Sequence, residues 1–399
     1  MNSQILRAAL VLGLLSAIGP FAIDMYLPAL PAIGASLEAN TAQVQMSLMS
    51  FMAAIAVCQL FYGPISDMVG RKPPLYFGMV VFVIGGIGSA MAPSIEWLVV
   101  ARFVQGIGAC AAMALPRAIV RDGYTGAEAA QLMSLLMLVF SVSPILAPLA
   151  GSLVIGFADW RWIFWAIAIV GVLGILLLAF ALEETRPAHL RVESSIGGAL
   201  RAYGTLLKDW NFLGLTFIGA FGMASFMAYL ANSSFVLIDH YGLTPTLYSV
   251  MFSINAVSFI GVAQLTGWLT RRFGLNRVVR MAVIGYVVVM LALFAVFLAN
   301  IDSLAVLATL LFIGYGFLGL VIPTTAVLAL EEHGEIAGTA SALMGTLQLV
   351  TAAVVMGVVG AFFNGTAQPM VFGIAACAVL AYVLTQVTIR PGRIAQPAE

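Results

Sequence analysis

The sequence predicts an all-α membrane protein with twelve transmembrane helices in two pseudo-symmetric six-helix bundles. Of its 399 residues, 62% are apolar and only 9% are charged, and the mean hydropathy is +1.07. Soluble domains average about 45–50% apolar and about 25% charged residues. Because about twenty apolar residues cross a bilayer as one helix, the chain has room for about a dozen spans with short connectors. This composition excludes a nucleic-acid-binding protein and a soluble enzyme.

Apolar runs bounded by charged residues, proline and glycine predict the twelve helices. They span Leu6–Pro31, Thr41–Ser66, Pro74–Ala92, Glu96–Ile119, Glu128–Gly156, Trp160–Leu182, Asn211–Ile238, Pro245–Thr270, Asn276–Ala299, Ser303–Leu330, Glu335–Phe363 and Pro369–Ile389. The runs are roughly two to three times longer than the alternating strands of a membrane barrel, and they are apolar on all faces. No clear cleavage site follows the first run, so we expect it to be retained as a span.

The basic residues gather on one side of the membrane in this topology. The loops and tails on the side of both termini hold 15 of the 17: Arg7, Arg71, Lys72, Arg117, Arg121, Arg186, Arg191, Arg201, Lys208, Arg271, Arg272, Arg277, Arg280, Arg390 and Arg393. The opposite loops hold Arg161 and the acids Glu38, Glu96, Asp159, Asp239 and Asp302. Because a basic excess marks the cytoplasmic side, we expect both termini in the cytoplasm and the chain in a bacterial inner membrane.

The chain divides into two halves of six helices. The glycines Gly63 and Gly70 recur 204 residues later at Gly267 and Gly274, and features of residues 116–137 recur at an offset of 207. Nearly equal offsets indicate a duplication, and two homologous halves around a midplane site are typical of transporters. The expected parts are a first bundle (1–183), a charged cytoplasmic linker (184–210) and a second bundle (211–399).

Two charged residues, Asp24 and Arg102, are predicted to lie well inside a span. At about 1.5 Å per residue, both lie about 10 Å below the periplasmic surface, where they could pair if the first and fourth helices face each other. A charge in the hydrocarbon costs several kcal/mol, so such residues usually face a cavity and mark an ion or proton pathway. Burial favours a neutral carboxyl group and a nearby arginine favours an ionised one. A proton carrier needs this balance; a permanent structural ion pair is the alternative.

The connector between the second and third helices carries a motif that reads Gly63-Pro-Ile-Ser-Asp67-Met-Val-Gly70-Arg71-Lys72. Its glycines permit a tight turn and a close helix approach, and Asp67 can bond helix N-termini. This Gly-x-x-x-Asp-x-x-Gly-Arg-Lys pattern resembles the signature of the major facilitator superfamily. The resemblance implies a cytoplasmic gate in which Asp67 and Arg71 bond to neighbouring helices, with Asp122 as a partner for Arg71. A plain basic loop is the alternative, and Arg271 in place of the aspartate predicts a degenerate gate in the second half.

Three further stretches, Ile23–Pro31, Arg102–Ala109 and Pro144–Ser152, resemble drug:proton antiporters and, within them, the bicyclomycin and chloramphenicol resistance subfamily. The resemblance implies that Asp24 takes part in proton coupling and Arg102 in proton transfer. It also implies that Pro144, Pro148 and Gly151 shape the packing of the helix that alternates. Ala147 and Ser152 stand where many members have glycine. Because prolines four apart bend any helix, a merely kinked helix is the alternative.

Polar and aromatic residues near the middle of the predicted helices are candidate substrate contacts. They are Tyr26, Gln59, Gln105, Phe140, Phe226, Tyr229, Asn232, Asn255, Tyr315 and Gln348. Together with 19 methionines, they suit moderately hydrophobic compounds that are neutral or weakly charged. For any single one, helix packing is the alternative. The cysteines lack metal or disulfide spacing, and the histidines lie in or beside loops, so we expect no metal site.

These features, together with the resemblance, which alone favours export over uptake, imply a proton-driven multidrug exporter. It is expected to be a secondary transporter and not an enzyme, to need no cofactor and to act as a monomer in the bilayer. Substrate binds between the halves from the cytoplasm, Asp24 takes a proton from the periplasm, and the halves rock about the site. A single deep acid predicts about one proton per substrate. The alternatives are export of an endogenous amino acid, sugar or nucleoside, proton-coupled uptake, and a membrane enzyme or sensor. The chain has no Gly-x-x-x-x-Gly-Lys-Ser/Thr loop for ATP-driven pumping and no His-Glu-x-x-His motif.

Overall fold

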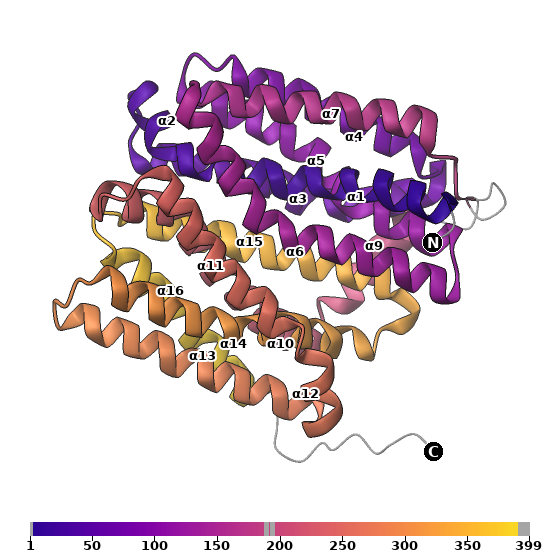
Figure 1. Ribbon diagram of the computed structural model, residues 1–399. Helices are drawn as coiled ribbons and strands as arrows, with labels where there is room; N and C mark the ends of the chain where they lie inside the picture. The colour runs from indigo at the N-terminus through magenta and orange to yellow at the C-terminus, as the bar shows by residue number, and fades with distance from the viewer. Residues whose placement is uncertain (1–2, 187–190, 192–195, 390–399) are drawn as a thin grey trace.

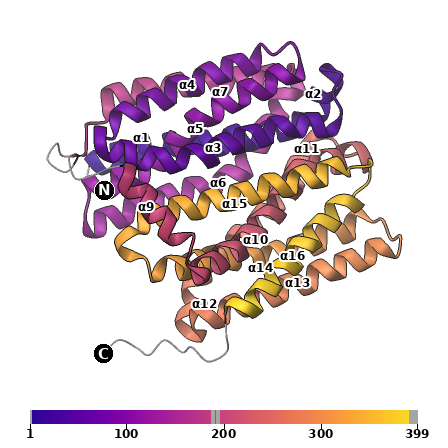
Figure 2. The same cartoon turned by 180° about the vertical axis from the view of Figure 1, so that it is seen from behind.

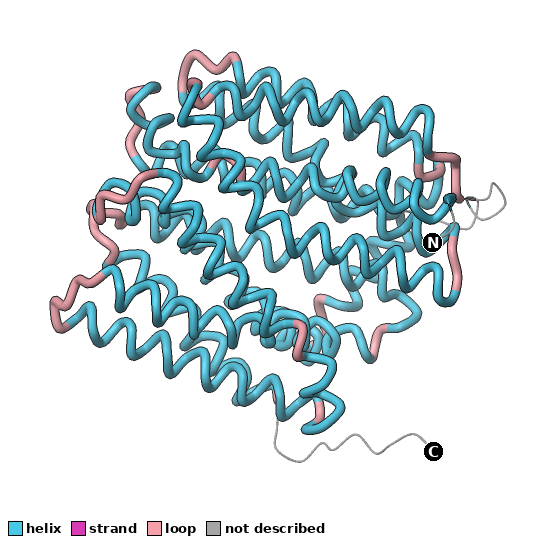
Figure 3. Tube along the Cα trace, viewed as in Figure 1, coloured by secondary structure: helices cyan, strands magenta, loops and turns pink. Residues whose placement is uncertain are grey.

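The computed structural model describes residues 3–186, 191 and 196–389, and the regular structure within these ranges is helical (Figure 3). Twelve helical segments are long and apolar enough to cross a membrane, which confirms the predicted number of spans. The first half holds α1 (Ser3–Asp24), η1 (Leu27–Ala29), α2 (Leu30–Ser36), α3 (Thr41–Val69), α4 (Lys72–Ala90), α5 (Ile95–Gly123), α6 (Gly126–Phe157) and α7 (Arg161–Ala181). Next come α9 (Ile196–Leu206), α10 (Trp210–Ser234), η2 (Phe235–His240), α11 (Pro245–Ala263), α12 (Thr266–Phe273), α13 (Leu275–Leu298), α14 (Leu304–Glu331), η3 (Gly334–Ile336), α15 (Ala337–Ala361) and α16 (Gln368–Thr388).

Several helices begin at a side chain that satisfies a free backbone N–H group. Asn40 and Gln43 form a reciprocal capping box at the start of α3, and Ser94 accepts from the N–H of Trp97 at the start of α5. Asp209 accepts from two N–H groups at the start of α10. These caps fix the ends of long apolar helices whose remaining length the bilayer stabilises.

Three spans are composite, where the sequence predicts continuous helices. The first consists of α1, the short 3-10 helix η1 and α2; the seventh of α10 and the π-helix η2; and the eighth of α11 and α12. Two predicted helices end too early: α3 continues to Val69 and α5 continues to Gly123. Asp67 and Asp122 therefore lie in helices and not in loops as the sequence analysis places them.

The spans form two bundles that repeat the same helix contacts (Figures 1 and 2). In the first, α3 and α4 both pack on α5, α1 packs on α6, and α4 packs on α7. In the second, α11 and α13 both pack on α14, α10 packs on α15, and α13 packs on α16. The predicted pseudo-symmetric fold is therefore confirmed. The bundles meet along two crossing pairs, α3 with α15 and α6 with α11.

The connector between the bundles contains the helix α9, which the sequence analysis did not predict. α9 contacts α3 of the first half and α15 of the second half. The Tyr203 hydroxyl donates to the carbonyl oxygen of Leu60 on α3 at 2.9 Å. The connector is thus anchored where the two halves already touch.

The ends of the spans define two faces of the molecule. We call the face that carries Arg71, Arg121, Arg271, Arg272 and Arg277 the basic face, and the other the opposite face. Arg390 and Arg393, which the sequence analysis assigns to the basic side, lie outside the described residues, as do His189 and the side chain of Arg7.

Candidate functional site

The first span is broken next to Asp24. The regular hydrogen bonding of α1 ends with the bond from the Met25 N–H to the Phe21 carbonyl oxygen, at 3.0 Å. Pro28 follows four residues after Asp24 and has no N–H to continue the helix. The carbonyl oxygen of Ala22 accepts a hydrogen bond from Arg102 Nη2 instead, at 3.0 Å. A broken helix that exposes backbone oxygens inside a membrane is typical of transporter binding sites.

Glycine at position 151 allows this break to lie directly against α6. A Cβ atom at Gly151 would overlap the carbonyl oxygen of Met25. Pro144 and Pro148 lie inside α6, which runs without interruption from Gly126 to Phe157. α6 therefore supports the break on one side and reaches α11 of the second half on the other.

Arg102 is fully buried and held by neutral groups. Its Nη1 donates to Gln105 Oε1 at 2.6 Å, and its guanidinium carbon lies 4.1 Å from the ring centre of Phe51 and 4.5 Å from that of Tyr26. Tyr26 in turn shares a hydrogen bond of 3.4 Å with Ser47. Ring faces attract a desolvated guanidinium. Thus α1, α3 and α5 together provide the environment of this charge.

Asp24 is 5% exposed and has no cationic partner within 4.0 Å among the residues that the structure describes. The possible ion pair with Arg102 is therefore not formed in this conformation. The segment η1, which begins three residues after Asp24, contacts α10 and α11. Asp24 therefore lies where the first half meets the second.

The two halves are joined by hydrogen bonds near the opposite face. Gln45 Nε2 donates to Asn232 Oδ1 at 2.9 Å and to the Ala231 carbonyl oxygen at 3.1 Å. On the other side of the interface, the Ser249 hydroxyl donates to the Pro148 carbonyl oxygen and that of Ser253 to the Ile145 carbonyl oxygen, each at 2.9 Å. Gln45 lies near the start of α3, and Ser249 and Ser253 lie in the first half of α11, on the side of Asp24. The two halves are therefore in contact between Asp24 and the opposite face, so the interface between them is closed on that side.

The motif between α3 and α4 forms an ionic cluster within the first half. Arg71 has a side chain that is 2% exposed, and its Nε lies 2.6 Å from Asp122 Oδ2 while its Nη2 lies 2.7 Å from Asp67 Oδ1. The connecting turn needs Gly70, which has a φ of 100°. Gly63 lies inside α3, where a Cβ atom would meet nothing within 4 Å, so the close helix approach expected at Gly63 is absent.

Glu184, which the sequence analysis did not select, completes this cluster. Its carboxylate accepts from the backbone N–H of Arg71 at 2.8 Å and of Lys72 at 3.1 Å. Burial alone would raise the pKa of Glu184, but these bonds and one from the N–H of Arg186 outweigh burial and lower that pKa. Lys72 Nζ donates to the Leu182 carbonyl oxygen at 2.6 Å. The turn is therefore tied to the end of α7.

The cluster predicts unequal effects of its two aspartates on stability. Asp122 is 10% exposed and Asp67 is 34% exposed. Removing one partner of a buried ion pair costs about 3–5 kcal/mol, whereas an exposed pair contributes about 0–1 kcal/mol. We expect Asp122→Asn to lower the thermal unfolding temperature in detergent clearly more than Asp67→Asn. Equal shifts for the two variants would show that Asp122 does not hold Arg71 as described.

Comparison with known proteins agrees with this arrangement. The family model of the Major Facilitator Superfamily matches residues 12–356. The chain belongs to this superfamily. An uncharacterized MFS-type transporter of Bacillus subtilis, YdgK, is 38% identical over 367 residues, which are 92% of this chain and 91% of that one. The solved xylose transporter XylE of E. coli, in a partially occluded inward-open conformation, has a TM-score of 0.74 at 14% identity over 98% of both chains.

Relatives within the superfamily also include proteins named for drug resistance. A bicyclomycin resistance protein homolog of Haemophilus influenzae is 30% identical over 382 residues, which are 93% of each chain. Multidrug resistance protein MdtL of Klebsiella pneumoniae is 30% identical over 383 residues, which are 94% of each chain. These relatives confirm the resemblance to the superfamily and to its bicyclomycin resistance proteins. The chain is therefore a multi-pass membrane transporter by family.

Four of the predicted substrate contacts form one aromatic cluster in the second half of the superfamily fold. Asn255 Nδ2 donates to the Tyr229 hydroxyl at 2.9 Å. Ring centres lie 5.4 Å apart for Tyr229 and Tyr315 and 5.7 Å apart for Phe226 and Tyr315. Phe252, which the sequence analysis did not select, stacks on Tyr229. Its helical spacing alone could not distinguish it from a packing residue.

The other predicted contacts have different surroundings. Tyr26 and Gln105 contact Arg102, and Asn232 accepts a hydrogen bond from Gln45. Gln59 Nε2 donates across the interface between the halves to Thr346 Oγ1 at 3.1 Å. Among the described residues, no partner is found for the buried Tyr315 hydroxyl, Gln105 Nε2 or Gln348 Nε2. These atoms are free to bind a polar group of a ligand or water. Phe140 lies beneath Arg117.

The second half keeps the backbone of the ionic turn but, among the described residues, not its ion pairs. Gly274, which is 204 residues after Gly70, also has a positive φ, of 81°, and Leu275 and Asn276 stand where Arg71 and Lys72 stand in the first half. No ion pair forms at this turn within the described part of the chain. The weaker second turn is consistent with the loss of the aspartate.

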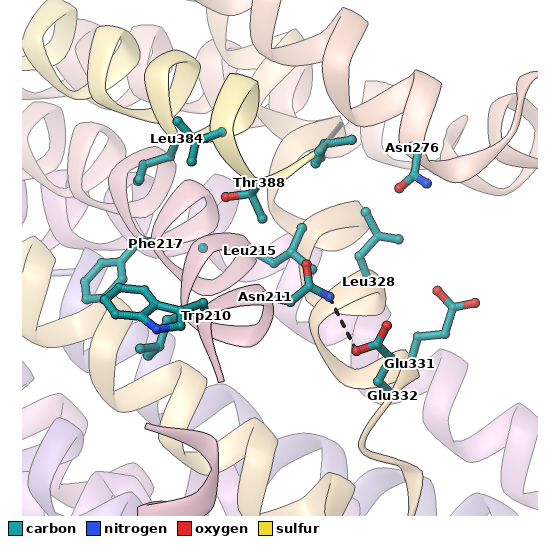
Figure 4. Close-up of a pocket in the computed structure, with 14 residues that line it drawn as sticks. Trp210, Asn211, Leu215, Phe217, Asn276, Leu328, Glu331, Glu332, Leu384 and Thr388 are labelled. Atoms are coloured by element: carbon teal, nitrogen blue, oxygen red, sulfur yellow. Dashed lines mark hydrogen bonds between the residues drawn. The ribbon is translucent and has the colours of Figure 1, made fainter. Parts of the chain in front are cut away.

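A pocket of about 1000 Å³ lies beside this second turn, at the basic-face ends of α10, α13, α14 and α16 (Figure 4). Asn276, Glu331, Glu332 and Trp210 are among the residues that line it, and Asn211 Nδ2 donates to Glu332 Oε2 at 3.5 Å. None of the predicted substrate contacts lines this pocket. It is therefore separate from Asp24 and from the aromatic cluster.

The described residues contain no group of three His, Cys, Asp or Glu side chains that could hold a metal ion. Two histidines contact carboxylates outside the bundle interiors. His240 Nε2 lies 2.6 Å from Asp302 Oδ2, and His333 Nε2 lies 3.0 Å from Asp209 Oδ2. Bonds to His240 and to the Tyr241 hydroxyl lower the pKa of Asp302, although burial alone would raise it. These contacts tie connecting segments together.

Proposed function

We propose that the protein exports small, moderately hydrophobic compounds from the bacterial cytoplasm in exchange for protons. The observation that carries this proposal is Asp24, a buried carboxyl group at the break of the first span that has no cationic partner among the described residues. A buried carboxylate is costly unless it is compensated, whereas its protonated form is not charged. Protonation of Asp24 therefore favours some arrangements of the halves over others, which is the condition for coupling.

The contacts around Asp24 support alternating access. The positive-inside rule puts the basic face and both termini in the cytoplasm of the inner membrane. With the halves joined by the Gln45 and Ser249 bonds, a substrate reaches the interface from the cytoplasm. Breaking those bonds opens the periplasmic side, where the substrate leaves and a proton reaches Asp24. Substrate and proton bind to different states of one equilibrium, and one deep acid gives about one proton per substrate.

Arg102 is placed to assist this exchange. Its Nη2 donates a hydrogen bond to the carbonyl oxygen of Ala22, two residues before Asp24. This bond maintains the break that exposes the Asp24 carboxyl group. A small movement of α1 against α5 brings the guanidinium towards Asp24 or away from it. The proton transfer role assigned to Arg102 is to stabilise the ionised carboxylate transiently after its proton leaves.

The ionic cluster at the basic face serves as the cytoplasmic gate. Its ion pairs all lie within the first half while the periplasmic side is closed, and Asp67 remains one-third exposed. When the cytoplasmic side closes, Asp67 becomes available to the neighbouring half. Arg71, Asp122 and Glu184 keep the turn rigid through this movement.

A drug-like substrate is favoured by the aromatic cluster of Tyr229, Phe226 and Tyr315 and by the names of the relatives. Rings and amides without charges bind moderately hydrophobic compounds. Because the loops offer no large docking surface, the unit of transport is a monomer.

The proposal is tested with purified protein in liposomes that contain a pH dye. Chloramphenicol and bicyclomycin are added first, and amino acids and sugars next, to the wild type and to Asp24→Asn. We expect a drug to move protons in the wild type and not in Asp24→Asn. A response only to an amino acid or sugar would identify a metabolite transporter. Equal responses of the two proteins would refute coupling through Asp24.

A further inference from the structure

An arginine outside the proton site lies unpaired within a span. Arg117 is six residues before the end of α5, so at about 1.5 Å per residue it lies about 9 Å inside the helix end. Its side chain is exposed, and no carboxylate lies within 4.0 Å of it among the described residues. The nearby acids Asp67 and Asp122 are already bonded to Arg71. Within the described part of the chain, this cation therefore has no anionic partner.

Arg117 lies on the side of α5 that packs against α1 and α3 farther along the helix. Met113, one turn earlier, occupies the space beside Gly19 of α1, and Cys110 contacts the Ile55 carbonyl oxygen of α3. Residues three or four apart share a helix face, so Arg117 continues this stripe.

The guanidinium of Arg117 is oriented by an aromatic ring. Its central carbon lies 5.0 Å from the ring centre of Phe140 on α6. α6 is also the helix that crosses onto α11, and its hydrogen bonds to α11 lie on the side of Asp24, at Ile145 and Pro148. Phe140 comes before this crossing, towards the basic face. The pair therefore lies between the basic face and the hydrogen bonds that join α6 to α11.

Arg117 and Phe140 together favour one chemical class of ligand. A guanidinium forms two parallel hydrogen bonds with a carboxylate, and it is less strongly hydrated than an ammonium group. A charge beside low-dielectric helix walls attracts an opposite charge more strongly than it does in water. The Phe140 ring restricts the guanidinium and adds apolar surface for the body of a ligand. An anionic group attached to an aromatic or aliphatic body fits both features.

We propose that Arg117 and Phe140 form a binding site for the carboxylate of amphipathic organic acids, which are thereby part of the substrate range. The proposal rests on the export function proposed above and assigns it a substrate class. Arg117 is 15 residues from Arg102 along α5, about 22 Å at 1.5 Å per residue. The site is therefore distinct from the proton site, and the two can be tested separately.

The test measures equilibrium binding of two matched probes, 1-naphthoate and neutral 1-naphthamide, to purified protein in uncharged detergent at pH 7.5. We expect the wild type to prefer the carboxylate. Arg117→Gln should weaken binding of the carboxylate at least tenfold and change binding of the amide less than twofold. Arg117→Lys should retain an intermediate affinity, because it keeps the charge but not the two parallel bonds. Phe140→Leu should weaken both probes.

A matched control is Arg121→Gln, which removes an exposed arginine one turn nearer the end of α5. It should leave the preference for the carboxylate unchanged. An equal loss in Arg121→Gln would show general attraction by the basic face and overturn the site. A wild type without a preference for the carboxylate, or an equal loss of both probes in Arg117→Gln, would also overturn it.

Two further arms separate the remaining explanations. If phosphatidylglycerol displaces 1-naphthoate from the wild type stoichiometrically, Arg117 binds a lipid headgroup and not a substrate. Asp24→Asn should keep the preference for the carboxylate. If that preference holds while no compound moves protons in liposomes, the proposed export function is wrong and the site stands. If chloramphenicol is exported and the preference is absent, the site alone is wrong.

Discussion

Replacing Arg102 with alanine is expected to reduce proton-coupled transport about a hundredfold or more. The substitution removes the donor to the Ala22 carbonyl oxygen and the partner of Gln105. Each buried polar group left without a partner costs about 1–3 kcal/mol, and about 2.7 kcal/mol corresponds to a hundredfold change in rate. The break that presents Asp24 would no longer be held. Arg102→Lys should also lose most activity, because an ammonium group cannot reproduce both bonds in this geometry.

Arg161 provides a matched control for Arg102. Its Nη2 donates to the Ala92 carbonyl oxygen at 3.0 Å, and its guanidinium lies over the ring of Trp160 at 4.3 Å, but its side chain is one-third exposed at the opposite face. Arg161→Ala should keep most of the transport activity. The measurement is proton flux in liposomes, with thermal unfolding to verify folding. A folded Arg102→Ala protein with normal flux would contradict the role assigned to Arg102.

A valine at position 151 is expected to abolish transport. Even a Cβ atom there would overlap the Met25 carbonyl oxygen, so α6 and the broken segment must move apart. Overpacking of a close contact costs about 1–3 kcal/mol, and here the displaced atoms adjoin Asp24. Because α6 also bonds to α11 through the Pro148 carbonyl oxygen, the displacement reaches the interface between the halves.

Gly156→Val is the control for Gly151→Val, because it adds the same side chain to the same helix where a Cβ atom would meet nothing within 4 Å. Both variants should insert into the membrane in similar amounts. Only Gly151→Val should lose drug-dependent proton flux. Similar fluxes in the two variants would show that the contact between α6 and the broken segment is not needed for transport.

The fold could be predicted from the sequence because one pattern, a long apolar run followed by a short connector, repeats along the chain. Long apolar runs and short connectors are sufficient to count twelve spans, and the repeats at offsets of 204 and 207 show the two halves. The breaks could not be predicted in the same way. Pro28 indicates that the first helix is disturbed, but the position of the break depends on Arg102 and Gly151, which come from other helices.

The candidate site was predictable where a residue is unusual in its own segment. Asp24 and Arg102 stand out as charges in apolar helices, and Arg71 belongs to a specific motif. Their partners were harder to find, because neutral residues make most of the contacts. Phe51, Ser249 and Glu184 look like packing, polar or linker residues until the fold brings them beside the site. Arg117 was counted with the basic residues of the cytoplasmic side because it lies near the end of its predicted helix, Glu96–Ile119.

The most direct test of the account is to count the protons released when a transported drug binds. Chloramphenicol or bicyclomycin, whichever moves protons in liposomes, is added to purified protein in weakly buffered detergent solution across a range of pH. The account predicts that the wild type releases up to about one proton per drug bound, within the pH range where Asp24 is protonated, and that Asp24→Asn releases none at any pH. Binding without release in the wild type across that range, or equal release from Asp24→Asn, would contradict the central claim that drug and proton compete through Asp24.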